Sequence, residues 1–494
     1  MTRKNRRKTA FFPKGALVIT SVLLLLFFLI YMLFTYHFKT HFFWRTEINN
    51  LSVSGMTLDE ATDRLAKEAE SYLLTIYDRD GNKYHISASD IDYTYIPGSE
   101  EAALLEQQHA LAWPKALFSP DSFSVKANVT YDETMLASAV SSLSCFDAAN
   151  ITEPEDARLE KNEDGFTIVS EISGTHLIEQ QVLAAVSSAV SAGETELTLS
   201  DGDYIAPQLV ATDSVLTDAL STINQYLATT VTYDIADADE ILDKEKIINW
   251  IVVGDDYSVS LDTTKLASYV QSLASKYNTY ADVRNFLTSK GDIIAIGGGD
   301  YGWIIDKEGE AAQLASDLAT GTAITREPVY QQRALYRETD DIGKSYVEID
   351  YTNQHLWYYK DGTLIAESDI VSGKISNGNG SPDGVYKIVY KQSPAVLKGE
   401  DYESNVTYFM PFAYNVGIHD ASWRNAFGGQ IYKNSGSHGC INVPLSCATA
   451  IYEAIDIGTP VVAYYREPVS LTSKSAKISN AYSYVDPEAD TVTP

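Results

Sequence analysis

Cysteine and basic residues are scarce in this chain of 494 residues. The three cysteines, Cys145, Cys440 and Cys447, are too few and too scattered for a disulfide framework or a four-thiolate zinc site. The chain contains 37 Lys and Arg but 67 Asp and Glu. The resulting formal charge of −30 argues against a nucleic-acid-binding protein. Hydrophobic residues make up 45% of the chain, which excludes disorder along its whole length.

An uninterrupted apolar segment lies near the start of the chain. Residues 15–36 carry no charge and, as a helix, are long enough to cross a hydrocarbon core of about 30 Å. Six cations lie in the basic segment 1–14, and the positive-inside rule places that segment in the cytoplasm. A cleaved signal peptide is the alternative, but Lys39 and several aromatic residues follow where a small-residue cleavage site would stand. We expect a single-pass membrane protein with a strongly acidic part outside the cell, a charge that favours amine-bearing ligands.

An internal repeat occupies the middle of the chain. VTYDETMLASAVSSLS around Asp132 matches VSLDTTKLASYVQSLA around Asp262 at an offset of 130 residues. In both, a short strand leads to an Asp that can cap a helix. A second match, residues 75–78 with 231–234, has an offset of 156, so the copies differ by an insertion. The pattern predicts two α+β modules, 45–205 and 206–330, in which Gly297 to Gly299 form a turn and no catalytic motif is found.

The last third of the chain is predicted to be mainly β. After a polar linker at 331–343, period-two alternation appears at 346–350, 356–359, 363–371 and 385–390. Pro444 opens a helix, and a final strand follows at 461–465. Residues 467–494 are polar and lack periodicity, which predicts a disordered tail.

Two histidines and a cysteine gather in the glycine-rich stretch from Asn415 to Pro444. A thiol becomes a strong nucleophile as its thiolate, which a nearby imidazole can generate by accepting the proton. His419 lies 21 residues before Cys440 and can approach it from another strand, so we expect it to be the base. His438 lies next to Gly439, which allows a tight turn that aims backbone N–H groups at an oxyanion. Zinc held by both histidines and the cysteine is the alternative, although the usual local ligand pairs are missing.

The hexapeptide SHGCIN at 437–442, with His419 upstream, resembles the signature of the L,D-transpeptidases, whose catalytic domain is the YkuD type. Residues 371–374 (VSGK) and 381–386 (SPDGVY) also resemble motifs of that family, so the likeness covers 344–466. Two residues depart from the pattern. Ser381 stands where Thr is commoner, and Asp420 stands where many members have Gly. The group that orients His419 is therefore either a backbone carbonyl or the Asp420 carboxylate.

The two modules resemble a duplicated peptidoglycan-binding domain, with a spacer above the membrane as the alternative. The whole resemblance implies acyl transfer in the bacterial cell wall, with no cofactor and no metal. Cys440 would attack a tetrapeptide stem at its third residue and release D-alanine, and His419 would take the thiol proton. An amine of a neighbouring stem would then attack the thioester and form a 3-3 cross-link.

The resemblance also assigns expected roles around the nucleophile. The amides of Gly439 and Cys440 would form the oxyanion hole, while Ser437, His438 and Asn442 would shape the loop and contact substrate. Trp423 and Arg424 are expected to line the site and hold a stem carboxylate. β-Lactams of the carbapenem type would acylate the thiol. Three alternatives stay open, namely an L,D-carboxypeptidase, a D-amino-acid exchange enzyme and an inactive wall-binding scaffold.

Overall fold

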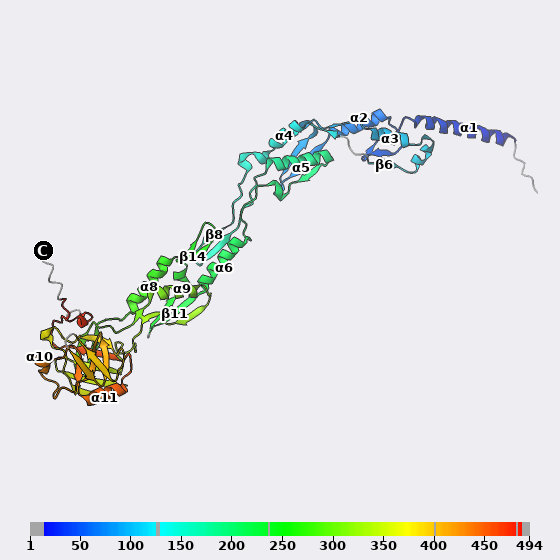
Figure 1. Ribbon diagram of the computed structural model, residues 1–494. Coiled ribbons are helices and arrows are strands. Elements are labelled where there is room, and N and C mark those ends of the chain that lie inside the picture. Colours follow the sequence, from blue (N-terminus) through cyan, green and yellow to red (C-terminus); the bar gives the residue numbers. More distant parts are fainter. Residues whose placement is uncertain (1–13, 125–128, 236–237, 400–401, 481–482, 487–494) are drawn as a thin grey trace, which may run out of the picture. The chain divides into compact units, whose positions relative to one another are not determined.

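The computed structural model describes residues 14–124, 129–235, 238–399, 402–480 and 483–486 (Figure 1). The basic segment predicted at 1–14 lies outside these residues except for Lys14. The chain forms two compact units. One contains residues 1–159 and 168–213, and the other contains residues 160–167 and 214–494.

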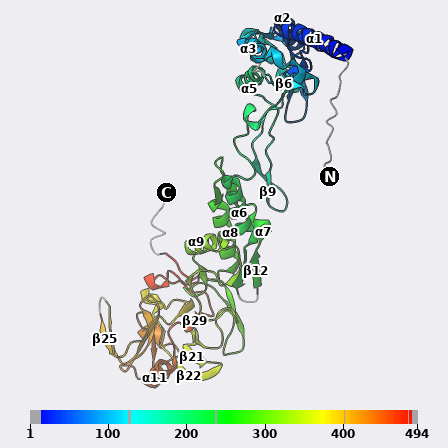
Figure 2. The ribbon, with the colours of Figure 1, turned by 90° about the vertical axis from the view of Figure 1, so that its right-hand side faces the viewer.

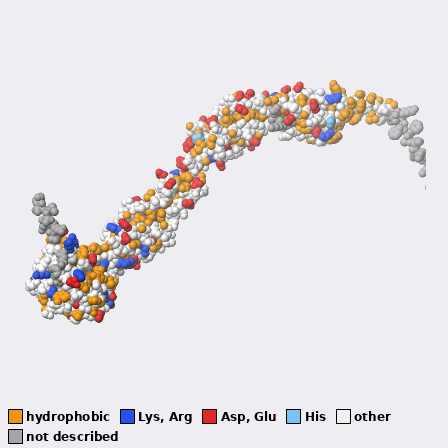
Figure 3. Space-filling view, viewed as in Figure 1, with side chains coloured by type: hydrophobic (Ala, Val, Ile, Leu, Met, Phe, Trp, Pro, Cys, Tyr) orange, Lys and Arg blue, Asp and Glu red, His pale blue; other side chains and the backbone are white. Residues whose placement is uncertain are grey.

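The apolar segment forms helix α1 (Lys14–His37), which confirms the predicted apolar helix. From Val18 to His37 its mean hydropathy is 2.6, so it can cross a membrane by length and composition. Hydrophobic side chains cover it in the space-filling view (Figure 3). Its last turns pack in the first unit, where Trp113 donates its indole N–H to the carbonyl of Tyr31 at 3.2 Å.

The first unit combines a small sheet near α1 with the first repeat, of which only residues 160–167 belong to the second unit. The order β2-β1-β6 forms the small sheet, and β10-β3-β4 forms the central sheet of the repeat. Helices α4 and α5 pack against each other over a core that includes Leu74, Val140 and Val186. The elements are β1 (Thr46–Ile48), β2 (Leu51–Ser52), α2 (Leu58–Ala69), β3 (Leu73–Tyr77), β4 (Lys83–Ser87), η1 (Ala88–Asp90), β5 (Thr94–Tyr95), α3 (Ser99–Gln107), η2 (Ala110–Leu117), β6 (Asp121–Phe123), β7 (Val129–Thr130), α4 (Glu133–Ser141), η3 (Ser144–Phe146), η4 (Ala148–Asn150), β8 (Arg158–Lys161), β9 (Phe166–Val169), α5 (Glu179–Ala192), β10 (Glu196–Thr198) and η5 (Asp201–Asp203).

The second repeat has the same plan, with the sheet β12-β11-β18 and the packed helices α8 and α9. Asp262 caps α8 by accepting the amides of Thr264 and Lys265, as Asp132 caps α4 in the first copy. The elements are α6 (Ser214–Ala228), β11 (Thr230–Ile235), β12 (Ala238–Leu242), α7 (Lys244–Ile247), β13 (Ile251–Val253), β14 (Val259–Leu261), α8 (Thr263–Tyr277), β15 (Arg284–Leu287), β16 (Ile293–Ile296), β17 (Ile304–Ile305), α9 (Lys307–Leu318), β18 (Ala323–Arg326) and β19 (Tyr330–Gln332).

The structure locates the insertion that distinguishes the two copies. In the second copy, residues 254–258 join β13 to β14 by a short turn. In the first copy, residues 96–128 join β5 to β7 and carry α3, η2 and β6. Strand β6 pairs in parallel with β1, so the insertion ties the repeat to the small sheet near α1.

The third part of the chain is built on a five-stranded sheet, β22-β21-β20-β29-β23, and a three-stranded sheet, β26-β27-β28. Helix α11 packs along β22 and β27 (Figure 2). Strands β26, β27, β28 and β29 are buried at every position, which matches their apolar runs. The elements are β20 (Tyr346–Asp350), β21 (His355–Lys360), β22 (Thr363–Asp369), η6 (Ile375–Asn377), β23 (Gly384–Lys387), β24 (Ala395–Lys398), β25 (Glu403–Val406), β26 (Phe409–Ala413), β27 (Val416–Asp420), α10 (Ile431–Ser435), β28 (Ile441–Val443), α11 (Leu445–Ala454), β29 (Pro460–Tyr464) and η7 (Lys474–Ala476).

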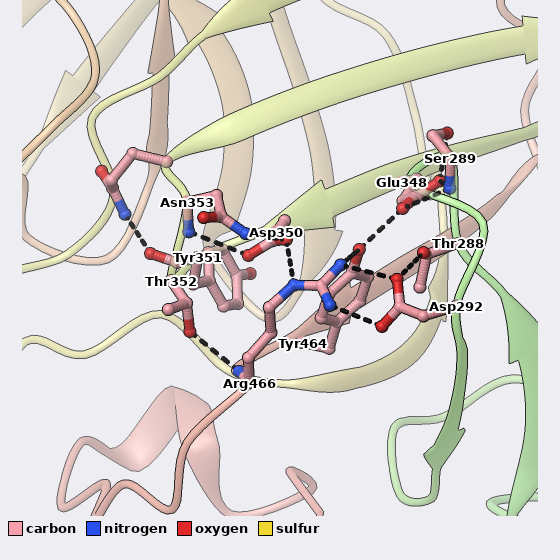
Figure 4. Close-up of polar contacts among 11 residues, drawn as sticks. Thr288, Ser289, Asp292, Glu348, Asp350, Tyr351, Thr352, Asn353, Tyr464 and Arg466 are labelled. Carbon is pink, nitrogen blue, oxygen red and sulfur yellow. Dashed lines mark hydrogen bonds and ion pairs between the residues drawn. The ribbon is translucent and has the colours of Figure 1, made fainter.

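The hairpin β15-β16 of the second repeat docks on the five-stranded sheet. Glu348 is fully buried and accepts the amide and hydroxyl of Ser289 and the hydroxyl of Tyr464 (Figure 4). Arg466 bridges the two parts, with Nε 2.6 Å from Asp350 and Nη1 2.6 Å from Asp292 (Figure 4). A shared apolar cluster lies beside these contacts, and its buried members are Phe286, Ile296, Tyr301, Trp303, Ala334, Ile342, Val385, Val462 and Tyr464.

We predict that replacing Arg466 by Ala destabilises this junction strongly. Asp350 is fully buried, and loss of its partner leaves an uncompensated charge that costs about 3–5 kcal/mol. Hydrogen exchange of the β20 amides should therefore accelerate by about 10²- to 10⁴-fold. The exposed Asp292→Asn is the matched control and should change exchange by less than about fivefold, because exposed ion pairs contribute little. Equal effects of the two changes would contradict this account.

Three expectations from the sequence differ from the structure. The polar linker 331–343 contains buried residues, because Asp341 pairs with Arg284 at 3.1 Å and Ile342 joins the shared apolar cluster. Gly299 has a φ of +86°, and a Cβ there would strike the backbone of Val385, so this stretch is a close contact with β23 as well as a turn. The tail predicted as disordered packs over its described residues, where Leu471 is fully buried.

Candidate active site

The loop that carries Cys440 is held by backbone contacts to residues 371–374. Val371 and Asn442 exchange two backbone hydrogen bonds of 3.0 Å, and Lys374 N–H donates to the Ser437 carbonyl. The buried Ser381 hydroxyl accepts from Gly373 N–H at 2.9 Å and donates to the Gly439 carbonyl at 2.6 Å. Gly439 adopts a φ of +122°, which favours glycine. The departure at Ser381 therefore keeps the hydroxyl that joins the two motifs.

The Cys440 thiol lies half-buried at the start of β28. It donates to the carbonyl of Asn415 at 3.6 Å and packs beside Phe409 and Val406. Burial raises the pKa of Cys440 to about 11, and the backbone N–H of Gly417, which points at the sulfur, opposes that rise. The thiol is therefore protonated at neutral pH in this arrangement and needs a base to become a nucleophile.

His419 lies on the buried strand β27 and has a partner on each ring nitrogen. Nδ1 lies 2.8 Å from the backbone carbonyl of Asp420, which can only accept, so Nδ1 carries the proton. Nε2 lies 3.0 Å from the side-chain amide nitrogen of Asn442 and accepts from it. Burial lowers the pKa of His419, and the Asp420 carbonyl opposes that shift. The imidazole is thus neutral at pH 7, with its lone pair on Nε2.

Arg424 determines which way the Asn442 amide faces. Its Nε donates to Oδ1 of Asn442 at 2.7 Å, and Nη1 donates to the carbonyl of Ser435 at 2.8 Å. Since the guanidinium can only donate, Oδ1 must face Arg424 and Nδ2 must face His419. Two nitrogens of Arg424 are engaged by the protein itself, and its contact with a stem carboxylate stays a prediction.

The Asp420 carboxylate serves a different part of the fold. Its Oδ1 accepts the amides of Thr407 and Tyr408, each at 2.8 Å, at the start of β26. The group that touches His419 is the backbone carbonyl of the same residue. Of the two orienting partners left open by the sequence, the geometry favours the carbonyl.

We predict that Asp420→Asn keeps most of the activity. The amide oxygen of Asn can still accept both N–H groups, and the backbone carbonyl is unchanged, so kcat/KM should fall by less than about threefold. A carboxylate that oriented the imidazole would be far more sensitive, with a loss near 10⁴-fold in kcat. Steady-state kinetics of the purified variant separates these outcomes.

The raised pKa of Cys440 predicts how its thiol reacts with an alkylating agent. With the thiol pKa near 11, the thiolate fraction rises about tenfold per pH unit across the neutral range. The alkylation rate with iodoacetamide should therefore rise steadily from pH 6 to 9. A preformed thiolate–imidazolium pair would instead give a rate that is level over this range. Mass spectrometry of the Cys440 peptide measures the rate at each pH.

Most of the predicted site residues line one pocket. Its walls include Cys440, His419, Asn442, Ser437, His438, Trp423 and Arg424. Asp420 and Gly439 do not line it. The ring of His438 stacks on Tyr402 with centroids 4.4 Å apart, and Trp423 lies 6.0 Å from the His419 ring.

Sequence reasoning missed the hairpin β24-β25, which contributes Leu397, Tyr402 and Ser404 to the pocket. No motif marks these residues, because the hairpin's approach to the site depends on the fold. Figure 2 shows this hairpin projecting from the domain. The carbonyl of Asn415 and the amide of Gly417 were also missed. Backbone groups of this kind leave no signal in residue type.

The other two cysteines lie outside this pocket, and the contacts of the two histidines bear on the zinc alternative. Cys145 and Cys447 are buried in separate cores. In the part of the chain that the structure describes, no group of three His, Cys, Asp or Glu side chains is arranged to hold a metal ion. His438 faces Tyr402, while both ring nitrogens of His419 have protein partners.

Two family models match the chain. Residues 344–462 match the L,D-transpeptidase catalytic domain, YkuD, and residues 86–198 and 212–324 match a peptidoglycan binding domain. The two latter matches fall within the two repeats. The comparison with curated proteins gave no significant match.

Several solved structures are similar to this chain. The Ldtfm–avibactam carbamoyl enzyme is 36% identical over 50% of this chain and 98% of that chain, with a TM-score of 0.44. A mutant of Enterococcus faecium L,D-transpeptidase, with serine for a cysteine, is 35% identical over 50% and 100%, with a TM-score of 0.44. The catalytic domain of E. faecium L,D-transpeptidase acylated by ertapenem is 44% identical over 25% and 98%, with a TM-score of 0.23.

The identity and the coverage of these relatives establish the family. Matches at 35% and 36% identity extend over nearly the full length of the relatives, and the catalytic-domain model covers the pocket that contains Cys440 and His419. This chain therefore belongs to the L,D-transpeptidase family.

Proposed function

We propose that the protein is a membrane-anchored L,D-transpeptidase that forms 3-3 cross-links in peptidoglycan outside the cell. The observation that carries the proposal is the meeting of Cys440, His419 and Asn442 in one pocket of a chain of this family. Helix α1 would be the anchor, with the basic segment 1–14 in the cytoplasm. The two peptidoglycan-binding domains support a location in the cell wall.

Catalysis would begin at the thiol. His419 Nε2 takes the proton of Cys440 once Asn442 and the thiol turn from their resting partners, and the sulfur attacks the carbonyl of the third stem residue. The C–N bond to D-alanine breaks, and the imidazolium returns the proton to the leaving amine. The acyl group is then held on Cys440 as a thioester.

The second half of the reaction reuses the same base. A side-chain amine of a neighbouring stem enters the pocket, loses a proton to His419 Nε2 and attacks the thioester. The new amide bond forms as the thiol leaves, and the proton goes back to the sulfur. A cationic amine is attracted to a protein whose formal charge is −30.

Backbone amides would stabilise the oxyanion in both steps. The amides of Gly439 and Cys440 are the proposed donors, with Gly439 N–H exchanging its bond to the Ser437 hydroxyl for one to the oxyanion. Arg424 would act on the base by fixing the Asn442 amide, and its remaining nitrogen and Trp423 would contact the stem. These separate roles for the nitrogens of Arg424 are supported by the protein acceptors that Nε and Nη1 already have.

Mass spectrometry of the reaction products tests the proposal. The full-length chain in detergent is incubated with a disaccharide-tetrapeptide. The expected product has the mass of two donors minus one D-alanine. A product equal to one donor minus D-alanine would mean hydrolysis and a carboxypeptidase, and incorporation of added D-amino acid would mean exchange. Absence of any product would contradict the enzyme assignment and favour the scaffold.

Carbapenems provide a second probe of the same site. The strained amide of a β-lactam presents a carbonyl to the nucleophile, and ring opening would leave an acyl group on Cys440. We expect the intact mass of the protein to rise by one carbapenem, with the adduct on the Cys440 peptide. An unmodified thiol after exposure would count against a competent site.

A further inference from the structure

A second pocket, of about 560 Å³, lies in the first unit. Its volume falls in the range of roughly 300–1,000 Å³ that is typical of small-molecule sites. Three tyrosines, Tyr72, Tyr93 and Tyr95, line it, and the rings of Tyr72 and Tyr93 stack with centroids 4.2 Å apart. The rest of the lining is divided between polar residues, Asn49, Asn50, Glu68, Ser71 and Thr195, and apolar residues, Leu51, Leu65, Ala69, Leu73 and Val129.

The second repeat has no tyrosine at the matching positions. The ladder between β5 and β7 pairs Tyr95 with Val129, and the ladder between β13 and β14 pairs Val253 with Val259. Val129 and Val259 are 130 residues apart, the offset that relates the copies, so Tyr95 corresponds to Val253.

The other two tyrosines can be aligned in the same way. Two residues before Tyr95 and Val253 stand Tyr93 and Ile251, and no tyrosine stands at 227–229, just before β11, where Tyr72 stands just before β3. The same fold therefore forms without aromatic rings at these three places. In the first copy Tyr93 is buried in the core and Tyr72 packs against it, and both side chains also line the pocket.

The charge of the pocket restricts the ligand. Among the described residues that line it, the only charged side chain is the acidic Glu68. Among these described residues a stem peptide with a free carboxylate would find no counter-charge, whereas an uncharged saccharide needs none. Tyrosine rings offer flat apolar faces to the C–H groups of a pyranose, and amide and hydroxyl side chains suit its hydroxyl and acetamido groups.

We propose that this pocket of the first repeat binds the glycan of the wall polymer, as a β-linked N-acetylated hexosamine chain. The inference rests on the proposed function, because this pocket and the catalytic site would bind the same polymer. The two copies then have separate tasks. The first binds saccharide, while the second holds the catalytic sheet through the hairpin β15-β16.

Saturation-transfer NMR with chitotetraose, an uncharged N-acetylglucosamine tetramer, tests this site on the full-length chain in detergent. We expect saturable binding by the wild-type protein. Tyr72→Ala, which removes the aromatic ring, should weaken it at least tenfold. Tyr72→Phe is the matched control, because it removes only the hydroxyl that donates to the Glu194 carbonyl, and should bind within threefold of wild type.

A second variant guards against a folding defect in Tyr72→Ala. Ser71 is exposed at the rim, so Ser71→Trp should obstruct the pocket without disturbing a core, and should also weaken binding at least tenfold. Absence of chitotetraose binding by the wild type would overturn the inference. So would unchanged binding by both Tyr72→Ala and Ser71→Trp, or binding of a sugar-free tetrapeptide that chitotetraose displaces.

The catalytic reaction gives an independent readout. Tyr72→Ala should form products from the soluble disaccharide-tetrapeptide at the wild-type rate, because the pocket lies outside the active site. Loss of product in the wild type with chitotetraose binding intact would remove the proposed function alone. Product formation without saccharide binding would remove this inference alone.

Discussion

Cys440→Ala is expected to abolish product formation, with a loss of about 10⁴-fold or more in turnover. Among the described residues that line the pocket, Cys440 carries the one thiol, and the hydroxyls of Ser404 and Ser437 are weaker nucleophiles that should not replace it. Product formation from the disaccharide-tetrapeptide, followed by mass spectrometry, measures the loss.

A matched control for this change is Cys447→Ala. Cys447 is buried in the core of the same domain and does not line the pocket, so its loss should leave turnover within about threefold of wild type. Binding of chitotetraose should be unchanged in both variants. Retained turnover in Cys440→Ala would overturn the assignment of the nucleophile.

His419→Ala is expected to lower kcat/KM by about 10²- to 10⁴-fold. The Asp420 carbonyl fixes the proton on Nδ1 and leaves Nε2 to accept a proton, and His419 is the histidine held in this way. Because burial lowers its pKa, the wild-type kcat/KM should rise with pH through a pKa below the usual 6.5 and then level off. In His419→Ala, kcat/KM should no longer show this rise with pH.

His438→Ala provides the comparison. His438 stacks on Tyr402 at the pocket wall, so its loss removes a packing and substrate contact and should cost less than about tenfold. Steady-state kinetics across pH 5 to 8 distinguishes the two histidines. A larger loss in His438→Ala than in His419→Ala would exchange their roles.

Much of the fold follows from patterns in the sequence. The apolar run, the repeated Asp-capped helices and the period-two strands each predict an element that the structure contains. These features are local, and each depends on a period or a cap within a few residues. The α+β repeats and the sheet-rich last domain are confirmed on this basis.

The contacts between parts of the chain could not be found in the same way. The strand Tyr346–Asp350 alternates apolar and acidic residues, but the pattern does not reveal that Ser289 and Arg466 cover Glu348 and Asp350. The linker and the tail are polar on average. A few buried residues, such as Ile342 and Leu471, are enough to attach them to the domain.

The catalytic pocket was predictable where side-chain chemistry marks it. Cys440, His419 and Asn442 stand out by residue type, and the structure brings them together. The Asp420 carbonyl, the Gly417 amide and the Asn415 carbonyl act through the backbone, so residue identity carries no information about them. The tyrosines of the first repeat carry no motif either, because they are separated in the sequence and meet only in the folded unit.

The most direct test of the account is to locate the acyl group during turnover. The full-length chain is mixed with the disaccharide-tetrapeptide, quenched in acid and digested, and the peptides are analysed by mass spectrometry. The account predicts a peptide containing Cys440 whose mass is raised by the donor minus D-alanine, and no such peptide from Cys440→Ala. Cross-linked product without an adduct on Cys440, or with the adduct on another residue, would contradict it.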